Sequence, residues 1–363
     1  MRWYKYIFVT LFASFCLANQ PVVASVVHVD DLSEHSSVYG ETAEEVDVAE
    51  LVFGHIGDSY GWHITTWHGK HITIPLPCII YSSTGWHVFM SSKLEHGEIY
   101  EGLYISEENK IMEVLSDGTI DRPFDISITK NVASLMISAL LLIIIVLGTA
   151  RWYKKHDAER EGAPTGFAGL VEMMVMMVTD DLIKPSIDEK YYRKYTPFLL
   201  TVFFFIFLSN LLGIVPFFPG GANVTGNIAV TMVLALFTFF MVNLFADKHY
   251  WKEILWPEAP IFLKFPLPIM QVIEIFGMIS KPFSLMVRLF ANILAGHAMI
   301  LGLVAVIFVT AKLGPVINGS MTGITLVFGV FMDCLELLVA FIQAYVFTML
   351  SAVFIGMSRQ GGH

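Results

Sequence analysis

Three polar residues interrupt a long apolar stretch near the C-terminus, and their types suit ion conduction. Arg288, Asn292 and His297 lie within the run SKPFSLMVRLFANILAGH at residues 280–297. A charge at the centre of a bilayer costs about 2.5–3.5 kcal/mol on insertion scales, so such charges are rare and usually functional. Arginine keeps its charge at any accessible pH and therefore cannot relay protons itself. We expect Arg288 to act electrostatically, by keeping a passing carboxylate ionised and by separating two water-filled paths.

Small residues accompany Arg288 on one face of the helix that this run predicts. Residues at steps of three or four share a helical face. Those on the face of Arg288 are Gly277, Ser280, Ser284, Ala291, Ala295, Ala298 and Gly302. Small residues let a second helix approach closely within a membrane, and ordinary helix packing would explain them but not the arginine. Since this stripe carries no carboxylate, we expect the group that faces Arg288 to come from another subunit.

The last apolar segment carries a second polar pair, Glu336 and Gln343, which are seven residues apart and so share a helical face. If the last two segments form an antiparallel hairpin that turns near residue 315, Arg288 lies at the depth of Gln343. The same register places His297 at the depth of Glu336. Histidine titrates between about pH 5 and 8, so a histidine–glutamate pair suits a proton relay. A structural hydrogen bond is the alternative for each residue alone, and the two coincident levels argue against it.

The composition indicates that a membrane surrounds these residues. Of the 363 residues 55% are hydrophobic and 15% are charged, whereas soluble proteins have roughly 25% charged residues. We expect an α-helical polytopic membrane protein with five crossings, an amphipathic surface helix, and a long, tilted hairpin formed by the last two helices. A span needs about 20 apolar residues. The expected spans are 131–150, 197–215, 227–245, 266–311 and 320–356, and the expected surface helix is 166–187.

The distribution of charge orients these spans. Lysine and arginine are frequent in the segment 151–196, which the positive-inside rule places in the cytoplasm. The part before the first span is therefore outside, and the C-terminus is cytoplasmic. In this register Glu274 lies near the inner surface and His297 nearer the outside.

The N-terminal part has a different character from the membrane part. Residues 26–130 contain 18 Asp and Glu against 5 Lys and Arg, and short runs such as GWHVFMSS alternate apolar and polar side chains. This pattern predicts a small β-rich domain outside the membrane. No basic patch indicates nucleic acid as a partner, and Cys78 alone cannot form a disulfide within the domain. We expect a signal peptide at 1–24 (a retained anchor is the alternative), an outer domain at 25–125, and a membrane domain at 126–363.

The run SKPFSLMVRLFANILAGH resembles the signature of subunit a of the rotary F-type ATP synthase. FLSNLLGIVP at 207–216, the IQAYVF run around Gln343 and the amphipathic segment after the first span are similar to the same family, in its order, over roughly residues 126–358. The resemblance implies a proton-conducting stator in the bacterial inner membrane that is not an enzyme on its own and has no cofactor or metal. Its implied partners are a rotor ring of subunit c, the peripheral stalk of subunit b, membrane lipid and, indirectly, the F1 catalytic sector.

The resemblance also implies roles for individual residues. Arg288 matches the essential arginine of the family. The inner path would include Glu274 and Ser280, and the outer path and its centre would include Asn292, His297, Glu336 and Gln343. Many bacterial members have glutamate where His297 stands and histidine where Glu336 stands, and we expect the exchanged pair to keep the relay. The N-terminal domain departs from the family, since many members begin shortly before the first span.

Two other classes of protein remain as alternatives. A secondary transporter would show internal repeats or broken helices at matching positions in two halves, and the two halves show no such repeat. A membrane sensor would need an outer ligand site, for which His63, His68, His71 and His87 are candidates because imidazole binds zinc and copper. Exposed histidines on β-strands are the simpler interpretation. No glycine-rich phosphate loop is present.

Overall fold

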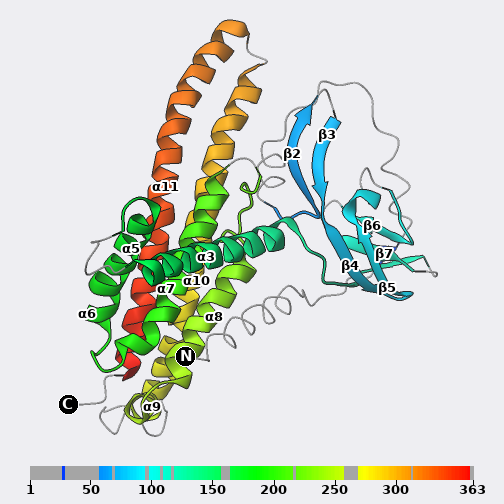
Figure 1. The fold of residues 1–363 in the computed structure, drawn as a ribbon. Coiled ribbons are helices and arrows are strands. Elements are labelled where there is room, and N and C mark those ends of the chain that lie inside the picture. Colours follow the sequence, from blue (N-terminus) through cyan, green and yellow to red (C-terminus); the bar gives the residue numbers. More distant parts are fainter. Residues whose placement is uncertain are drawn as a thin grey trace. The chain divides into compact units, whose positions relative to one another are not determined.

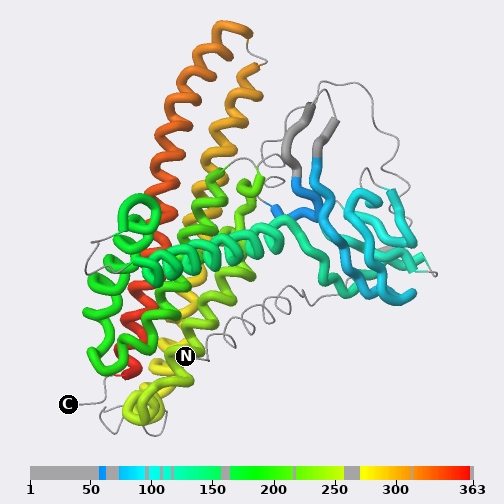
Figure 2. Tube along the Cα trace, in the orientation of Figure 1, coloured from blue at the N-terminus to red at the C-terminus, as the bar shows by residue number. Residues whose placement is uncertain are grey.

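The computed structural model describes most of the chain after residue 56. The described residues are 27–28, 57–67, 70–94, 98–106, 109–115, 118–156, 164–215, 218–256, 269–311 and 314–359. The expected signal peptide therefore lies outside them. The chain divides into two compact units, which are Met1–Leu135 with Val215–Asn223 and His297–Val330, and Met136–Ile214 with Val224–Gly296 and Phe331–His363. Figures 1 and 2 trace their elements in chain order.

The N-terminal part of the first unit is a β-domain, as the alternating sequence predicts. Its strands are β1 Val27–His28, β2 Gly61–Trp67, β3 Lys70–Pro75, β4 Pro77–Ser82, β5 Gly85–Met90, β6 Leu103–Ile105, β7 Ile111–Val114, β8 Thr119–Asp121 and β9 Phe124–Asp125. They form three antiparallel sheets with the strand orders β1-β8-β7-β6, β2-β3 and β5-β4-β9. The period of two explains which side chains are buried: Cys78 and Ile80 of β4 are buried, whereas Tyr81 is exposed.

The core of this β-domain is a single apolar cluster. It consists of Tyr60, Cys78, Ile80, Phe89, Leu94, Leu103 and Ile111. Cys78 is a free, buried thiol, in agreement with the expectation that it forms no disulfide within the domain. Burial raises the pKa of this thiol to about 12, so it stays protonated and unreactive at neutral pH.

A buried aspartate joins the β-domain to the helix that follows it. Helix α3 spans Lys130–Lys155. The carboxylate of Asp58 accepts hydrogen bonds from the backbone amide of Asn131 at 3.0 Å and from the hydroxyl of Thr129 at 2.7 Å. Because the first amides of a helix have no intrahelical partner, Asp58 caps α3 from a distant part of the chain. The amide of Lys130 also donates to the carbonyl of Ser59 at 2.8 Å, so the domain and the start of the helix are tied together.

The remaining elements are helices. They are α5 Phe167–Met177, a π-helical turn Val178–Ile183, α6 Lys184–Ser186, α7 Tyr192–Ile214, α8 Ile228–Leu244, α9 Lys248–Leu255, α10 Ile269–Thr310 and α11 Pro315–Arg359. Within the described chain, four helices are long and apolar enough to cross a membrane, namely α3, α7, α10 and α11. The number is five if α8 and α9, which meet at a bend of 102°, count as one broken span. This agrees with the five crossings expected from the sequence.

The last two helices are longer than a bilayer is thick. Helix α10 has 42 residues and α11 has 45, so at 1.5 Å per residue each is roughly 60–70 Å long against a hydrocarbon core of about 30 Å. The sequence left open whether these segments tilt or break, and each forms one continuous helix, with Pro282 inside α10. Gly314 has a φ of +103° directly before the start of α11, a conformation that glycine adopts readily.

Helices of the second unit pack through aromatic and small residues. Phe203 and Phe207 of α7 contact Phe341 of α11, with ring centroids 6.1 Å and 6.0 Å apart. At the C-terminal end of α11 the guanidinium of Arg359 donates to the hydroxyl of Tyr195 at 2.9 Å and pairs with Asp247 at 3.0 Å. These contacts hold the end of α11 against α7 and against the bend between α8 and α9.

We predict that Gly356→Ala destabilises the helix packing, because an added Cβ would lie 1.9 Å from the carbonyl oxygen of Ser186. Neither backbone can yield without moving its helix, and overpacking of this kind costs about 1–3 kcal/mol. The thermal unfolding midpoint of the purified protein measures the effect. Gly148→Ala is the matched control, since its added Cβ would meet nothing within 4 Å. Equal midpoints for the two variants would contradict the close approach of α6 and α11.

We also predict a pH dependence at the cap of α3. Burial raises the pKa of Asp58 above its ordinary value of 3.8. The folded state therefore binds more protons than the unfolded state as pH rises above about 3.8, and the free energy of unfolding falls through that window. Asp58→Asn should remove this slope while keeping a capping side chain. Pulse proteolysis of the β-domain in the full-length protein at several pH values measures it, with Asp121→Asn as control. If the free energy of unfolding of Asp58→Asn still falls with pH in this window, the pH dependence does not come from Asp58.

Candidate functional site

Arg288 lies on an open face of α10. The neighbouring flank of the helix packs into the second unit, where Leu285, Leu289 and Ile293 are buried. Arg288 itself is exposed, and so are the small residues beside it: Ser284, Ala291 and Ala295. Among the described residues no carboxylate forms an ion pair with the Arg288 guanidinium. Within the described residues, the chain therefore presents a fixed positive charge on an exposed face of α10.

The glycines of the same stripe leave room for a neighbouring helix. A Cβ added at Gly277 or at Gly302 would meet nothing within 4 Å. Both positions follow the stripe that the sequence predicts, one on each side of Arg288. The stripe is consequently smooth and open along several helical turns, as close approach of another helix requires.

The polar residues of α11 point toward the interior of the second unit. Glu336 and Gln343 are each 6% exposed, and their spacing of seven residues places them on one face. The Glu336 carboxylate lies against α10 at Gly296, where an added Cβ would be 3.2 Å from its Oε1 atom. The hairpin register predicts His297 opposite Glu336, and Gly296 is the residue directly before His297. The register expected from the sequence is thus met at this contact.

The remaining outer positions lie on α10. Asn292 is exposed and His297 is half-buried. Because His297 belongs to the first unit and Glu336 to the second, the relay between these two side chains stays a prediction.

Asn210 is a polar contact of this region that the sequence interpretation missed. Its side-chain amide donates to the backbone carbonyl of Ala340 at 3.3 Å, and its oxygen accepts from the hydroxyl of Thr225. Ala340 lies on α11 between Glu336 and Gln343, so Asn210 brings a third polar side chain from α7 to the same stretch. The sequence did contain a signal for Asn210, because an asparagine inside the apolar run FLSNLL needs a hydrogen-bonding partner. The sequence does not show which residue that partner is.

A second polar group lies near the part of α10 that precedes Arg288. The hydroxyl of Ser280 donates to the carbonyl of Gly277 at 3.1 Å. Tyr250 of α9 donates to Asn243 Oδ1 at 3.4 Å. Burial and then the negative charge of Glu274 raise the pKa of Tyr250, so this tyrosine stays protonated near neutral pH. Glu274 and Ser280 were expected from the sequence, whereas Tyr250 and Asn243 were not.

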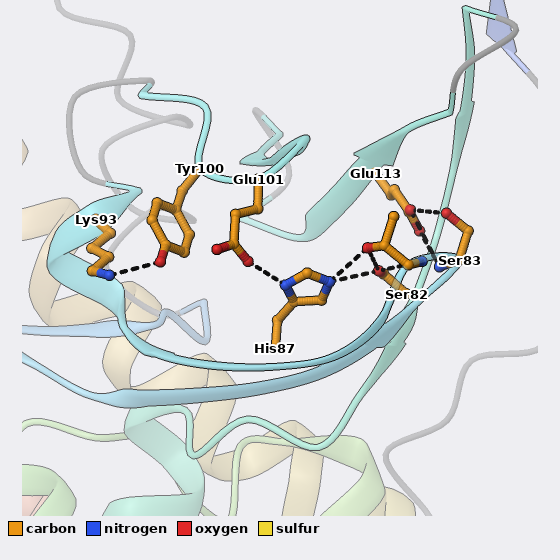
Figure 3. A network of polar contacts seen from close by, with 8 residues as sticks. Ser82, Ser83, His87, Lys93, Tyr100, Glu101 and Glu113 are labelled. Carbon is orange, nitrogen blue, oxygen red and sulfur yellow. Dashed lines mark hydrogen bonds and ion pairs between the residues drawn. The ribbon is translucent and has the colours of Figure 1, made fainter.

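The histidine of the β-domain that the structure describes in full belongs to a polar network (Figure 3). His87 Nδ1 pairs with Glu101, and its Nε2 lies 2.9 Å from Ser82 Oγ and 2.7 Å from Thr84 Oγ1. The hydrogen bond with His87 lowers the pKa of the Glu101 carboxyl. Both ring nitrogens are thus engaged in contacts that join β5 to neighbouring loops.

A metal site formed with the other three candidates is not supported in the described part of the chain. The side chains of His63 and His71, and all of His68, lie outside the described residues. Within the described residues no group of three or more potential metal ligands occurs.

These features define the class of protein. Several apolar spans, a permanent charge on an open helical face, and a buried carboxylate, Glu336, on the adjacent helix are the features of an ion-conducting membrane subunit.

Comparison with known proteins identifies the family of this membrane subunit. A family model described as "ATP synthase A chain" matches residues 133–356, and the chain belongs to this family. The family is that of subunit a of the H⁺-transporting ATP synthase, the proton-translocating stator of the membrane sector, which is a channel subunit rather than a catalytic one. The protein is accordingly a multi-pass membrane protein of a bacterial ATP synthase. A second model, a domain of unknown function, matches residues 51–131.

Curated relatives agree with this assignment. "ATP synthase subunit a 2" of Chlorobaculum tepidum is 42% identical over 236 residues, which are 65% of this chain and 64% of the relative. "ATP synthase subunit a" of Chloroherpeton thalassium is 40% identical over 242 residues, or 65% of this chain and 67% of the relative. The Myxococcus xanthus "ATP synthase subunit a" is 37% identical over 305 residues, or 80% of this chain and 90% of the relative.

We predict that Gly296→Ala slows proton conduction without preventing assembly. The added Cβ would lie 3.2 Å from Glu336 Oε1, so the carboxylate must shift by a few tenths of an ångström from its present position. Gly319→Ala, whose Cβ would meet nothing within 4 Å, is the matched control. Passive proton flux through membranes stripped of the catalytic sector measures both. Wild-type flux in an assembled Gly296→Ala complex would show that the position of Glu336 does not matter.

Proposed function

We propose that the chain conducts protons along two half-channels that meet a rotor ring at Arg288. Protons enter from outside, neutralise a carboxylate of the ring, and leave on the inner side after the ring has turned. The outer path and its centre use Asn292, His297, Glu336 and Gln343, and the inner path uses Ser280 and Glu274. Asn210 belongs to the outer path in this proposal, because it contacts α11 between Glu336 and Gln343.

The observation that carries the proposal is the exposure of Arg288 among small residues. A guanidinium stays protonated, so it favours the ionised form of any carboxylate that approaches it in a medium of low dielectric constant. The open stripe allows another helix to bring such a carboxylate close. A ring carboxylate must therefore lose its proton before it passes Arg288, and it can regain one only on the other side.

The energies involved are compatible with rotation. One charge that crosses the membrane potential releases about 2.3 kcal/mol per 100 mV. A hydrogen-bonded contact between charged groups contributes about 1.5–3 kcal/mol. The carboxylate–arginine contact can therefore be formed and broken in each step without stalling the ring.

Membership in the family implies a complex with the ring of subunit c and the stalk of subunit b. We assign the face of Arg288 to the ring, and we expect lipid around the other spans and only indirect contact with the F1 sector. The basic residues at the C-terminal end of α3, which include Arg151, Lys154 and Lys155, support a cytoplasmic location for this side of the bacterial inner membrane. The β-domain is then periplasmic and the C-terminus cytoplasmic.

Arg288→Ala should abolish ATP-driven acidification of inverted membrane vesicles, because nothing then forces the ring carboxylate to release its proton. Quinacrine quenching measures the acidification, after the assembly of the complex has been verified. Arg193→Ala, which removes an exposed arginine at the start of α7, is the control and should pump as the wild type does. An assembled Arg288→Ala complex that pumps normally would make Arg288 a packing or topology residue.

A further inference from the structure

A small cavity lies within the second unit, on the cytoplasmic side of Arg288. It is lined by residues of α8, α9, α10 and the C-terminal part of α11, and its volume is about 10 Å³. A buried water needs roughly 10–15 Å³ on the same measure together with two to four polar partners. The cavity is therefore the size of one water molecule.

Its lining supplies the polar partners. Four of the lining side chains are polar, namely Thr238, Asn243, Tyr250 and Lys281. The Asn243 amide donates to the carbonyl of Phe239 at 2.8 Å, and its oxygen accepts from the Tyr250 hydroxyl at 3.4 Å. These two bonds fix the orientation of the amide. The weak contact between Tyr250 and Asn243 leaves capacity at both oxygens for a further hydrogen bond.

Helix α10 adds a backbone acceptor. Proline has no amide hydrogen, so Pro282 cannot donate to the carbonyl of Met278, four residues earlier, as a normal helical residue would. Both Met278 and Pro282 line the cavity. Freed carbonyls within membrane helices are commonly satisfied by ordered water or by neighbouring side chains. The Met278 carbonyl, which Pro282 leaves without its helical donor, thus gives a water in the cavity an acceptor in addition to the polar side chains.

The cavity also adjoins the inner proton path. Glu274, Met278 and Lys281 follow one another at steps of four and three, so they share a face of α10. The charge of Glu274 acts on Tyr250, which is one of the residues that line the cavity. Lys281 lies with its ammonium group 5.6 Å from the ring centroid of Phe354 on the same side.

We propose that this cavity holds one ordered water, bound by Lys281, Tyr250 and Asn243, that links the membrane interior to Glu274. The proposal deepens the inner half-channel and rests on the proposed function. The water accepts a proton from the membrane interior as it releases one of its own toward the inner side, so one O–H bond forms as another breaks. The released proton passes on to the Glu274 carboxylate, which lies beyond the lining of the cavity. A concerted transfer avoids a free hydronium beside the Lys281 ammonium. Tyr250 remains protonated and acts as a positioning residue.

Two substitutions test the proposal from different sides. Tyr250→Phe removes the hydroxyl and keeps the ring. Val242→Leu, at a lining position of α8, fills the cavity and keeps every polar group. Each should slow passive proton conductance of the assembled complex about three- to tenfold, as expected for the loss of one hydrogen bond from the path. The dependence of conductance on the pH of the inner side should change as well, which a purely structural role would not produce.

The matched controls are Trp251→Phe on α9 and Val233→Leu on α8, neither of which lines the cavity; both should conduct as the wild type does. Wild-type conductance of Tyr250→Phe, together with a loss of ATP-driven pumping in Arg288→Ala, would overturn the water site and leave the proposed function standing. Slow conductance of Tyr250→Phe with normal conductance of Val242→Leu would also overturn it, because the hydroxyl would then act without water. If Val242→Leu does not assemble, the result for Tyr250→Phe decides alone. ATP-driven pumping by an assembled Arg288→Ala complex at the wild-type level would instead refute the proposed function.

Discussion

The permanent charge of Arg288 is the constraint on which the rest of the membrane part depends. A guanidinium cannot discard its proton to escape an apolar environment, so the protein must accommodate it. Burial of Leu285, Leu289 and Ile293 fixes the neighbouring flank of α10 against the second unit. The side that carries the charge is left open, and small residues keep it accessible to another helix.

Polar groups on both sides of this charge then have distinct tasks. On α11, Glu336 lies against Gly296, and Asn210 reaches Ala340 one turn further along. In the part of α10 that precedes Arg288, the break in hydrogen bonding at Pro282 coincides with a cavity that polar side chains line. In the proposed function protons use such groups, and the fixed charge of Arg288 prevents a continuous proton path through the membrane. A leak across the subunit would dissipate about 2.3 kcal/mol per charge for each 100 mV, and Arg288 is positioned to block it.

Much of this arrangement could be predicted from the sequence, because periodicity identifies the face of an element on which a residue lies. The stripe around Arg288, the level of Glu336 and the buried side of β4 all follow from periods of 3.6 and 2. The periodicity of an element does not show which other segments of the chain its faces contact. The contact of Asn210 with Ala340, the backbone approach of Gly356 to Ser186, and the capping of α3 by Asp58 each join segments that are distant in the chain. Local sequence carries no signal for such pairings.

The central claim is that Arg288 separates two aqueous paths, and cysteine accessibility from each side of the membrane tests it most directly. Asn292→Cys and Ser280→Cys, one on each side of Arg288 along α10, would be introduced into a protein from which the native cysteines have been removed. A membrane-impermeant thiol reagent would then be applied to vesicles of either orientation. The account predicts that Asn292→Cys reacts only from the outside and Ser280→Cys only from the inside. Reaction of both positions from the same side would contradict it.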